Sequence, residues 1–296
     1  MKTVCYNFMP VLDWARTELE YPWPDGSTSL YFDYSRFAYF DIKILGRDHA
    51  REDYPDYILE KVDKLCGILT PEDDARLVDT IIVRTQGFVN GNISSADASP
   101  VEKFRRLLSL YEGVPAEDLR GNLAYFLKAI MPVCEKWGID MCIHPDDPPL
   151  KKVFGLPRIM TCAEDIRWLL SSVDNPHNGL TFCAGSLSAG RENDVVAMAR
   201  EFAPRTAFVH LRSCTPLPEG NFIEAEHTGG RANLVELCRI FTSEERRRGR
   251  AIPMRVDHAR NILSDKDGGY NPGYGFYGRM FALGQVSGMM AAVQDE

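Results

Sequence analysis

Four short apolar runs in the chain each end, on their C-terminal side, at a residue that can bind a metal ion. The runs at 139–143, 180–182, 206–209 and 252–256 are followed directly by His144, Cys183, His210 and Asp257. Runs of this length are typical of buried strands, and the helical segments between them predict right-handed βαβ units with parallel strands. In a (β/α) barrel the chemistry lies at the C-terminal strand ends. We therefore predict that these four side chains converge on one ion.

The donor set narrows the choice of metal without fixing it. Two imidazoles, a thiolate and a carboxylate suit a borderline divalent ion such as Zn, Fe(II), Mn or Co. A single histidine or cysteine is more often a structural residue than a ligand. The prediction therefore depends on all four residues, which occupy equivalent positions at the ends of separate strands.

The strand count predicts an α/β chain of the (β/α)8 TIM-barrel type that is incomplete. About five barrel strands are expected, at 2–8, 139–144, 180–184, 206–211 and 251–257. A closed barrel of this type needs eight strands. We expect a single partial barrel domain over residues 1–296, with a helical and loop insertion at 18–115 that forms a cap or a subunit contact beside the barrel mouth.

Helices are expected where apolar residues recur at three- and four-residue spacing or where a capping pattern opens the segment. These helices lie near 51–66, 71–83, 99–111, 116–137, 161–173, 192–202, 231–247 and 279–293. The segment 9–50 is rich in turn-forming and aromatic residues and is expected to form loops, as is the small-residue segment 183–187.

Composition excludes several classes of protein. The net charge of −8 argues against nonspecific nucleic-acid binding, which depends on neutralising phosphates. No stretch approaches the roughly 20 apolar residues that span a bilayer. The eight cysteines form no CxxC pair, and no signal peptide is recognisable, so we expect reduced thiols in a cytoplasmic enzyme without membrane partners. A homo-oligomer is expected.

Further polar residues flank the predicted strand ends. Arg255 lies on the same side of its strand as Asp257, and an arginine that points into a barrel interior requires an anion. Arg212 follows His210 by two residues and is expected at the mouth. Asp146 lies in a rigid acidic loop, either as a helix-entry turn or as a substrate-facing group. Tyr274 belongs to a turn before the last helix, where it either packs in the loop or delivers a phenol to the mouth.

Six segments, in the same order along the chain, resemble motifs of the mannonate dehydratase family of hexuronate catabolism. They are residues 5–14, 142–149, 182–186, 208–212, 255–258 and 271–274. The resemblance implies a xylose-isomerase-like TIM barrel, Fe(II) or Mn(II) as cofactor, and a sugar-acid substrate. The implied reaction is the dehydration of D-mannonate to 2-dehydro-3-deoxy-D-gluconate, catalysed by a hydro-lyase.

The same resemblance assigns roles to individual residues. His144, Cys183, His210 and Asp257 match the metal ligands, and Arg255, His258 and Tyr274 match residues needed for activity. Substrate contacts are expected from Arg212, Asp146, Trp14 and Arg16. We expect Arg255 first, and Arg212 second, to hold the substrate carboxylate. His258 and Tyr274 are expected to form the acid and base pair, without a direction assigned to the proton transfers.

Two departures from the family pattern accompany the resemblance. Family members carry about a hundred further residues, including three barrel strands, before the segment that begins here at residue 2. The loop between His258 and Tyr274 is about two residues longer than usual. Two alternatives stay open: a metal-dependent sugar isomerase or epimerase on the same barrel, which would share the ligand types, and a truncated inactive protein that binds metal. A barrel endonuclease is disfavoured by the acidic charge and by Cys183, an unusual ligand for phosphodiester chemistry.

Overall fold

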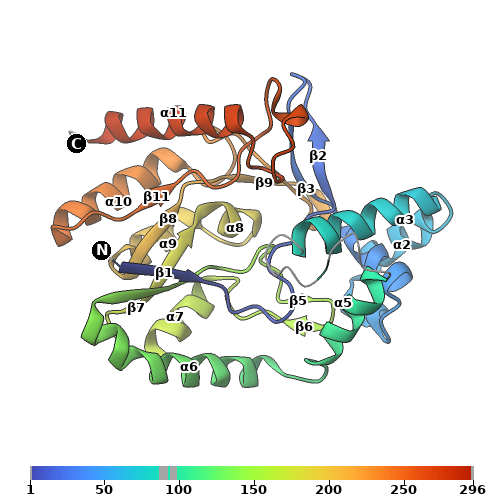
Figure 1. The fold of residues 1–296 in the computed structure, drawn as a ribbon, viewed down its shortest axis with the longest axis horizontal. Coiled ribbons are helices and arrows are strands. Elements are labelled where there is room, and N and C mark those ends of the chain that lie inside the picture. Colours follow the sequence, from blue (N-terminus) through green and yellow to red (C-terminus); the bar gives the residue numbers. More distant parts are fainter. Residues whose placement is uncertain (1, 87–92, 94–98, 295–296) are drawn as a thin grey trace.

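The computed structural model describes residues 2–86, 93 and 99–294, and its centre is a curled parallel sheet (Figure 1). Five strands form this sheet in the order β1 (Lys2–Tyr6), β4 (Ile139–Ile143), β7 (Asn178–Cys183), β8 (Thr206–His210) and β11 (Met254–Arg255). The five expected barrel strands are thus confirmed. The sheet makes half a barrel, in which β1 and β11 are the outer strands, so a closed eight-stranded barrel is not observed.

Helices that follow the parallel strands along the chain cover the convex side of the sheet. They are α6 (Ala116–Trp137), α7 (Ala163–Ser172), α9 (Val195–Phe202), α10 (Leu234–Arg248) and α11 (Phe276–Val293). Helix α6 buries Leu119, Leu123 and Leu127 at four-residue spacing, and it ends at Gly138, which adopts the left-handed conformation at φ 60°. The amphipathic pattern thus sets both the buried face and the length of this helix.

Two segments that were expected to be loops are regular structure, so those two predictions were wrong. An antiparallel sheet orders β2 (Glu18–Pro22), β3 (Thr28–Phe32), β10 (Phe222–Glu224) and β9 (Cys214–Pro216). The helix α8 (Ala184–Ala189) begins directly after Cys183. Strands this short carry little local signal, and β3 pairs with a partner about 190 residues away, so tertiary contacts outweigh local propensity.

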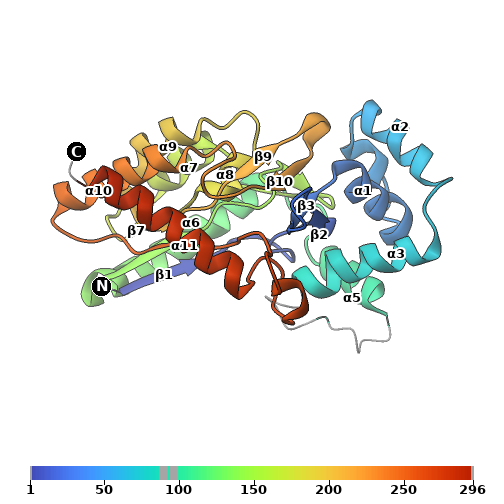
Figure 2. The same cartoon turned by 90° about the horizontal axis from the view of Figure 1, so that it is seen from above.

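The insertion is mostly helical and packs around an apolar cluster of its own, separate from the cluster between the parallel sheet and its helices. Its elements are α1 (Tyr34–Tyr39), η1 (Phe40–Leu45), η2 (Ala50–Asp53), α2 (Asp56–Leu65), α3 (Pro71–Val78), η3 (Asp79–Arg84) and α5 (Pro100–Ser109). The hairpin β5 (Lys152–Val153) and β6 (Leu156–Pro157) contributes Phe154 to the same cluster. In Figure 2 these helices lie at one end of the molecule, beyond β2 and β3.

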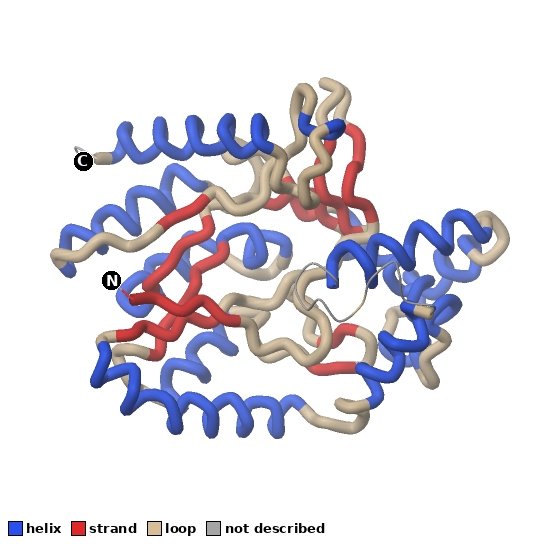
Figure 3. The backbone as a smooth tube through the Cα atoms, viewed as in Figure 1, coloured by secondary structure: helices blue, strands red, loops and turns tan. Residues whose placement is uncertain are grey.

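The remaining short helices lie in connections at η4 (Ala203–Arg205), η5 (Pro218–Gly220) and η6 (Asp265–Asp267). Figure 3 shows the loops that leave the C-terminal ends of the parallel strands running toward the antiparallel sheet. Within the described part of the chain, no helix combines the length and the apolar character needed to cross a membrane.

Candidate metal centre

Three of the four predicted ligands meet at the C-terminal ends of β4, β7 and β8. The candidate ligand atoms of His144, Cys183 and His210 all lie within 4.8 Å of one another, and we call these three residues the ligand cluster. Cys183 and His210 are buried, and the rings of His144 and His210 lie 5.1 Å apart between centroids. Registered pairing of Cys183 with His210 across β7 and β8 explains why these two side chains lie together.

The two histidines are presented differently. Nδ1 of His144 lies 2.7 Å from the carbonyl oxygen of Pro145, so it can donate there and leave Nε2 as the ligand atom. Both ring nitrogens of His210 are buried and have no hydrogen-bond partner among the residues described. Because a buried polar atom without a partner is costly, this ring is arranged for a ligand that binds a lone pair. An imidazole in that state fits a metal ion.

Electrostatics favour the ligand form of the thiol. Burial alone would raise the pKa of Cys183, but Arg212 and His144 hold it well below its usual value. For His144 burial acts in the opposite direction and lowers the pKa. The negative charge of the nearby Cys183 thiolate outweighs this effect and raises the pKa of His144 to about 10. The hydroxyl of Ser186 also donates to Sγ of Cys183 over 3.2 Å. A thiolate is the form of cysteine that binds metals.

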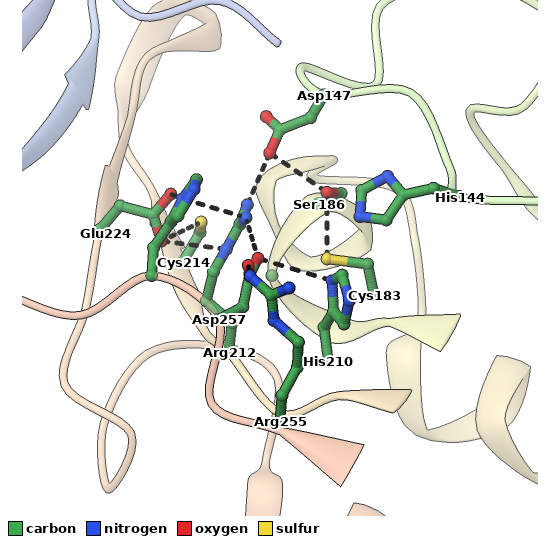
Figure 4. A network of polar contacts seen from close by, with 12 residues as sticks. His144, Asp147, Cys183, Ser186, His210, Arg212, Cys214, Glu224, Arg255 and Asp257 are labelled. Atoms are coloured by element: carbon green, nitrogen blue, oxygen red, sulfur yellow. Dashed lines mark hydrogen bonds and ion pairs between the residues drawn. The ribbon is translucent and has the colours of Figure 1, made fainter. Parts of the chain in front are cut away.

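Asp257 lies beside the ligand cluster (Figure 4). Its Oδ2 is 3.5 Å from Nδ1 of His210 and 3.0 Å from Nη1 of Arg212. Burial would raise the pKa of this carboxyl, but His258, His210 and Arg212 hold it well below its usual range. Asp257 also has φ 56°, an uncommon conformation for a residue other than glycine, and such conformations concentrate at functional sites.

The residues expected to be needed for activity surround Asp257. Nη2 of Arg255 donates to Oδ1 of Asp257 and, over 2.9 Å, to the hydroxyl of Tyr274. The Tyr274 hydroxyl lies 3.1 Å from the same carboxylate oxygen, and burial followed by the charge of Asp257 raises the pKa of the phenol. The rings of His258 and Tyr274 lie 5.1 Å apart between centroids. Arg255, His258 and Tyr274 are therefore held in one group.

A second group of polar residues lies next to the ligand cluster. We call it the buried charge network, and it consists of Arg16, Asp147, Arg212 and Glu224. Arg16 contacts Asp147 and Glu224, each over 2.7 Å. Arg212 contacts Asp147 over 2.6 Å and Glu224 over 3.1 Å, and it also reaches Asp257. The arginine charges lower the pKa of Asp147 far below its usual value and that of Glu224 to about 2, against the raising effect of burial.

A cavity of about 170 Å³ connects these residues. Its lining comprises Cys5, Asn7, Asp13, Trp14, His144, Asp147, His210, Arg212, Arg255, Asp257, His258 and Tyr274.

Gly185, the second residue of α8, lies against the side chain of Arg212. Any Cβ at this position would collide with the guanidinium of Arg212. The close approach of α8 to Arg212 therefore requires glycine at this position.

Comparisons with known proteins agree with this geometry. Residues 1–296 match the family model described as D-mannonate dehydratase (UxuA). The chain belongs to the D-mannonate dehydratase family. It is 42% identical over 294 residues to the mannonate dehydratase of Marinomonas sp. (strain MWYL1), an alignment that covers 97% of this chain and 73% of the relative.

Two further relatives support the family assignment. The mannonate dehydratase of Chromohalobacter salexigens is 38% identical over 297 residues, covering 99% of this chain and 74% of the relative. The crystal structure of mannonate dehydratase from Streptococcus suis serotype 2 matches with a TM-score of 0.71 and 30% identity, covering all of this chain and 67% of that one. The family resemblance and the hydro-lyase class predicted from the motifs are thereby confirmed.

Within this mannonate dehydratase fold, the predicted substrate residues are placed unequally. Trp14 lines the cavity, and its ring centroid lies 5.2 Å from that of His258. Arg212 also lines the cavity but is engaged by three carboxylates. Arg16 is fully buried in the charge network and is not among the lining residues. Asp146 is also outside the lining: it accepts a hydrogen bond of 2.8 Å from the backbone N–H of Met160.

Sequence reasoning missed four polar residues of this site: Asn7, Asp13, Asp147 and Glu224. Asn7 directly follows β1 as His144 follows β4, but the strand expected at 2–8 ran past this position, so the strand-end rule did not mark it. Asp147 belongs to the acidic loop in which Asp146 was chosen instead. Glu224 lies on β10, a strand that was not predicted, and no local signal marks it.

Proposed function

We propose that this chain dehydrates D-mannonate to 2-dehydro-3-deoxy-D-gluconate, using Fe(II) or Mn(II) held by His144, Cys183, His210 and Asp257. The observation that carries the proposal is the convergence of the ligand atoms of His144, Cys183 and His210, together with the lack of a hydrogen-bond partner for either ring nitrogen of His210 among the residues described. Family membership supplies the substrate class. The borderline donor set supports a first-row divalent ion, and the thiolate and imidazoles argue against Mg²⁺ or Ca²⁺.

The reaction breaks the C2–H bond and the C3–O bond of the substrate. The resulting enol rearranges to the 2-keto acid, and the C3 hydroxyl leaves as water. When bound, the metal supplies Lewis acidity that stabilises charge developing next to the carboxylate. The protein must hold that carboxylate, accept the C2 proton and protonate the leaving hydroxyl.

Arg255 is the better candidate for binding the carboxylate. Its side chain is 36% exposed and borders the cavity, whereas the Arg212 side chain is 2% exposed and already contacts three carboxylates. An arginine that binds substrate must offer N–H groups to it, and Arg255 has the accessible guanidinium. Arg212 instead orients Asp257 and supports the thiolate form of Cys183.

His258 and Tyr274 are the proposed acid and base pair. Both line the cavity, their rings lie 5.1 Å apart between centroids, and the Tyr274 hydroxyl lies 3.1 Å from Oδ1 of Asp257, which supports this assignment. Trp14 packs against His258, with 5.2 Å between the ring centroids. Proton transfer by two positioned groups accounts for both proton steps that the dehydration requires.

The test is an assay of the purified chain with D-mannonate and added Mn(II), or Fe(II) without oxygen, with the product identified by mass. Loss of 18 mass units and formation of a 2-keto-3-deoxy acid are expected. An isomeric product of unchanged mass would instead establish the isomerase or epimerase alternative, and metal binding without turnover would establish the inactive alternative. Cytoplasmic location and assembly into a homo-oligomer stay predictions.

A further inference from the structure

The cavity has a second set of polar residues, which the proposed chemistry does not use. Asn7 and Asp13 reach it from the segment that follows β1, whereas the proposed metal ligands lie at the ends of β4, β7, β8 and β11. Nδ2 of Asn7 donates a hydrogen bond to Oδ1 of Asp13. This amide and carboxylate pair therefore faces the same space as the reacting groups.

Asp13 differs from the other carboxylates of the cavity in its partners. Asp147 and Asp257 each contact arginines, whereas Asp13 has no ion pair among the residues that the structure describes. Its side-chain hydrogen bond comes from a neutral amide. A carboxylate can accept several hydrogen bonds, so Asp13 keeps acceptor capacity that no neighbouring cation has taken.

The insertion fixes the backbone that carries this pair. Oε1 of Gln86 accepts a hydrogen bond of 3.0 Å from the backbone N–H of Asp13. Nε2 of Gln86 donates over 2.7 Å to the carbonyl oxygen of Trp14. Gln86 is 2% exposed and lies two residues after η3 of the insertion. Two hydrogen bonds from one buried amide thus hold the segment in place before any substrate arrives.

The substrate of the proposed reaction has a part that such a pair would recognise. Dehydration involves C1 to C3 of the aldonate, and the rest of the six-carbon chain carries hydroxyls at C4, C5 and C6. Each hydroxyl both donates and accepts a hydrogen bond, and a carboxylate beside an amide offers both complements. A hydrogen bond to an ionised carboxylate is also stronger than one between neutral groups.

We propose that Asn7 and Asp13 form a hydroxyl-binding subsite for the C4–C6 part of the aldonate, next to the ring of Trp14. This inference rests on the proposed function. A site built to bind a hydroxyl discriminates strongly against analogues that lack it, because its own polar groups are then left unpaired. The pair would therefore determine which sugar acids are used, and Gln86 would act as a positioning residue for it.

The experiment compares two substrates in the Mn(II)-loaded protein. D-Mannonate is set against 2,3-dihydroxybutanoate, which has the same configuration at C2 and C3 but lacks the hydroxyls at C4, C5 and C6. Asp13→Ala and Asn7→Ala should each lower kcat/KM for D-mannonate about 10- to 100-fold, the loss expected for hydrogen bonds to a charged group. For the short acid, kcat/KM should stay unchanged.

Controls separate a binding role from a structural one. Asp118→Asn changes an exposed carboxylate in the first turn of α6 and should leave both substrates unaffected. Circular dichroism and bound Mn(II) are measured for each variant, and Asn7→Ala provides the comparison if Asp13→Ala does not fold. If the short acid turns over too slowly, its inhibition constant against D-mannonate replaces kcat/KM.

An equal loss for both substrates would overturn the subsite, because it would mean that the pair supports the fold or the proton transfers. Unchanged kinetics with D-mannonate would overturn it as well. Failure of the wild-type protein to dehydrate D-mannonate at all would instead refute the proposed function, so the two failures are distinguishable.

Discussion

The ligand cluster and the buried charge network lie side by side at the strand ends, yet their polar groups are satisfied in different ways. In the network, two guanidinium charges are matched by the carboxylates of Asp147 and Glu224. In the ligand cluster, His210 is just as inaccessible to solvent but makes no hydrogen bond within the described residues. The charges of the network are thus matched without a ligand, whereas neither ring nitrogen of His210 has a hydrogen-bond partner among the described residues.

This difference separates structure from chemistry more clearly than residue type does. Arginines and carboxylates at a barrel mouth suggest substrate binding. A buried charged group that is already paired with a counter-charge, however, has few hydrogen-bonding groups available for a substrate. The His210 imidazole makes no hydrogen bond among the described residues and lies beside a thiolate with a lowered pKa, so it has a lone pair available. We therefore expect changes in the ligand cluster to alter turnover, and changes in the network to alter stability.

Cys183→Ser should produce the largest effect on turnover. The change keeps nearly the same volume but removes the thiolate, so the bound Mn(II) or Fe(II) should be lost and kcat/KM should fall at least ~1000-fold, equivalent to several kcal/mol of transition-state stabilisation. Metal content and the rate with D-mannonate are measured together. The melting temperature of the metal-free protein should change little. Full metal content with normal turnover would remove Cys183 from the site.

Arg16→Met should have the opposite profile. It leaves Asp147 and Glu224 partly unmatched in the interior, and breaking a buried ion pair in this way costs about 3–5 kcal/mol. Urea denaturation of the metal-free protein gives the free energy of unfolding. Arg51→Met is the matched control, because Arg51 contacts Asp63 on the surface, where such a pair contributes about 0–1 kcal/mol. Equal effects of the two changes would contradict the assignment of Arg16 to a structural network.

His258 lies between the two groups and tests where their boundary falls. Its Nδ1 is 3.3 Å from Nη1 of Arg212 and 3.7 Å from Oε1 of Glu224, while its ring faces the cavity. His258→Asn should keep the metal but lower kcat at least ~100-fold, as expected when a general acid or base is removed. A near-normal rate, with reduced stability instead, would place His258 in the network and remove it from the reaction.

The comparison also shows which parts could be predicted from the sequence. The ligand positions could be predicted, because each lies at the end of an apolar strand and parallel strands bring their C-terminal ends to one edge of the sheet. The buried charge network could not be predicted, because Glu224 lies on a three-residue strand whose pairing with β3 joins distant segments. Arg16, two residues beyond the motif at 5–14, was expected to contact substrate. A motif can place an arginine near the mouth but cannot show whether a counter-charge has already engaged it.

A pH dependence provides the smallest test of the same distinction. Glu224 has its pKa lowered to about 2 in the folded protein, from an ordinary value of 4.5, because Arg212, His258 and Arg16 outweigh the raising effect of burial. Its contribution to stability is therefore present above pH 4.5 and is lost as the pH falls toward 2. Within that window the unfolded chain binds one more proton at this residue, which lowers stability by at most about 1.4 kcal/mol per pH unit. Urea denaturation between pH 4.5 and 3.5 should therefore show a shallower pH slope for Glu224→Gln than for the wild type, and equal slopes would mean that the carboxylate of Glu224 is not held ionised by the arginines around it.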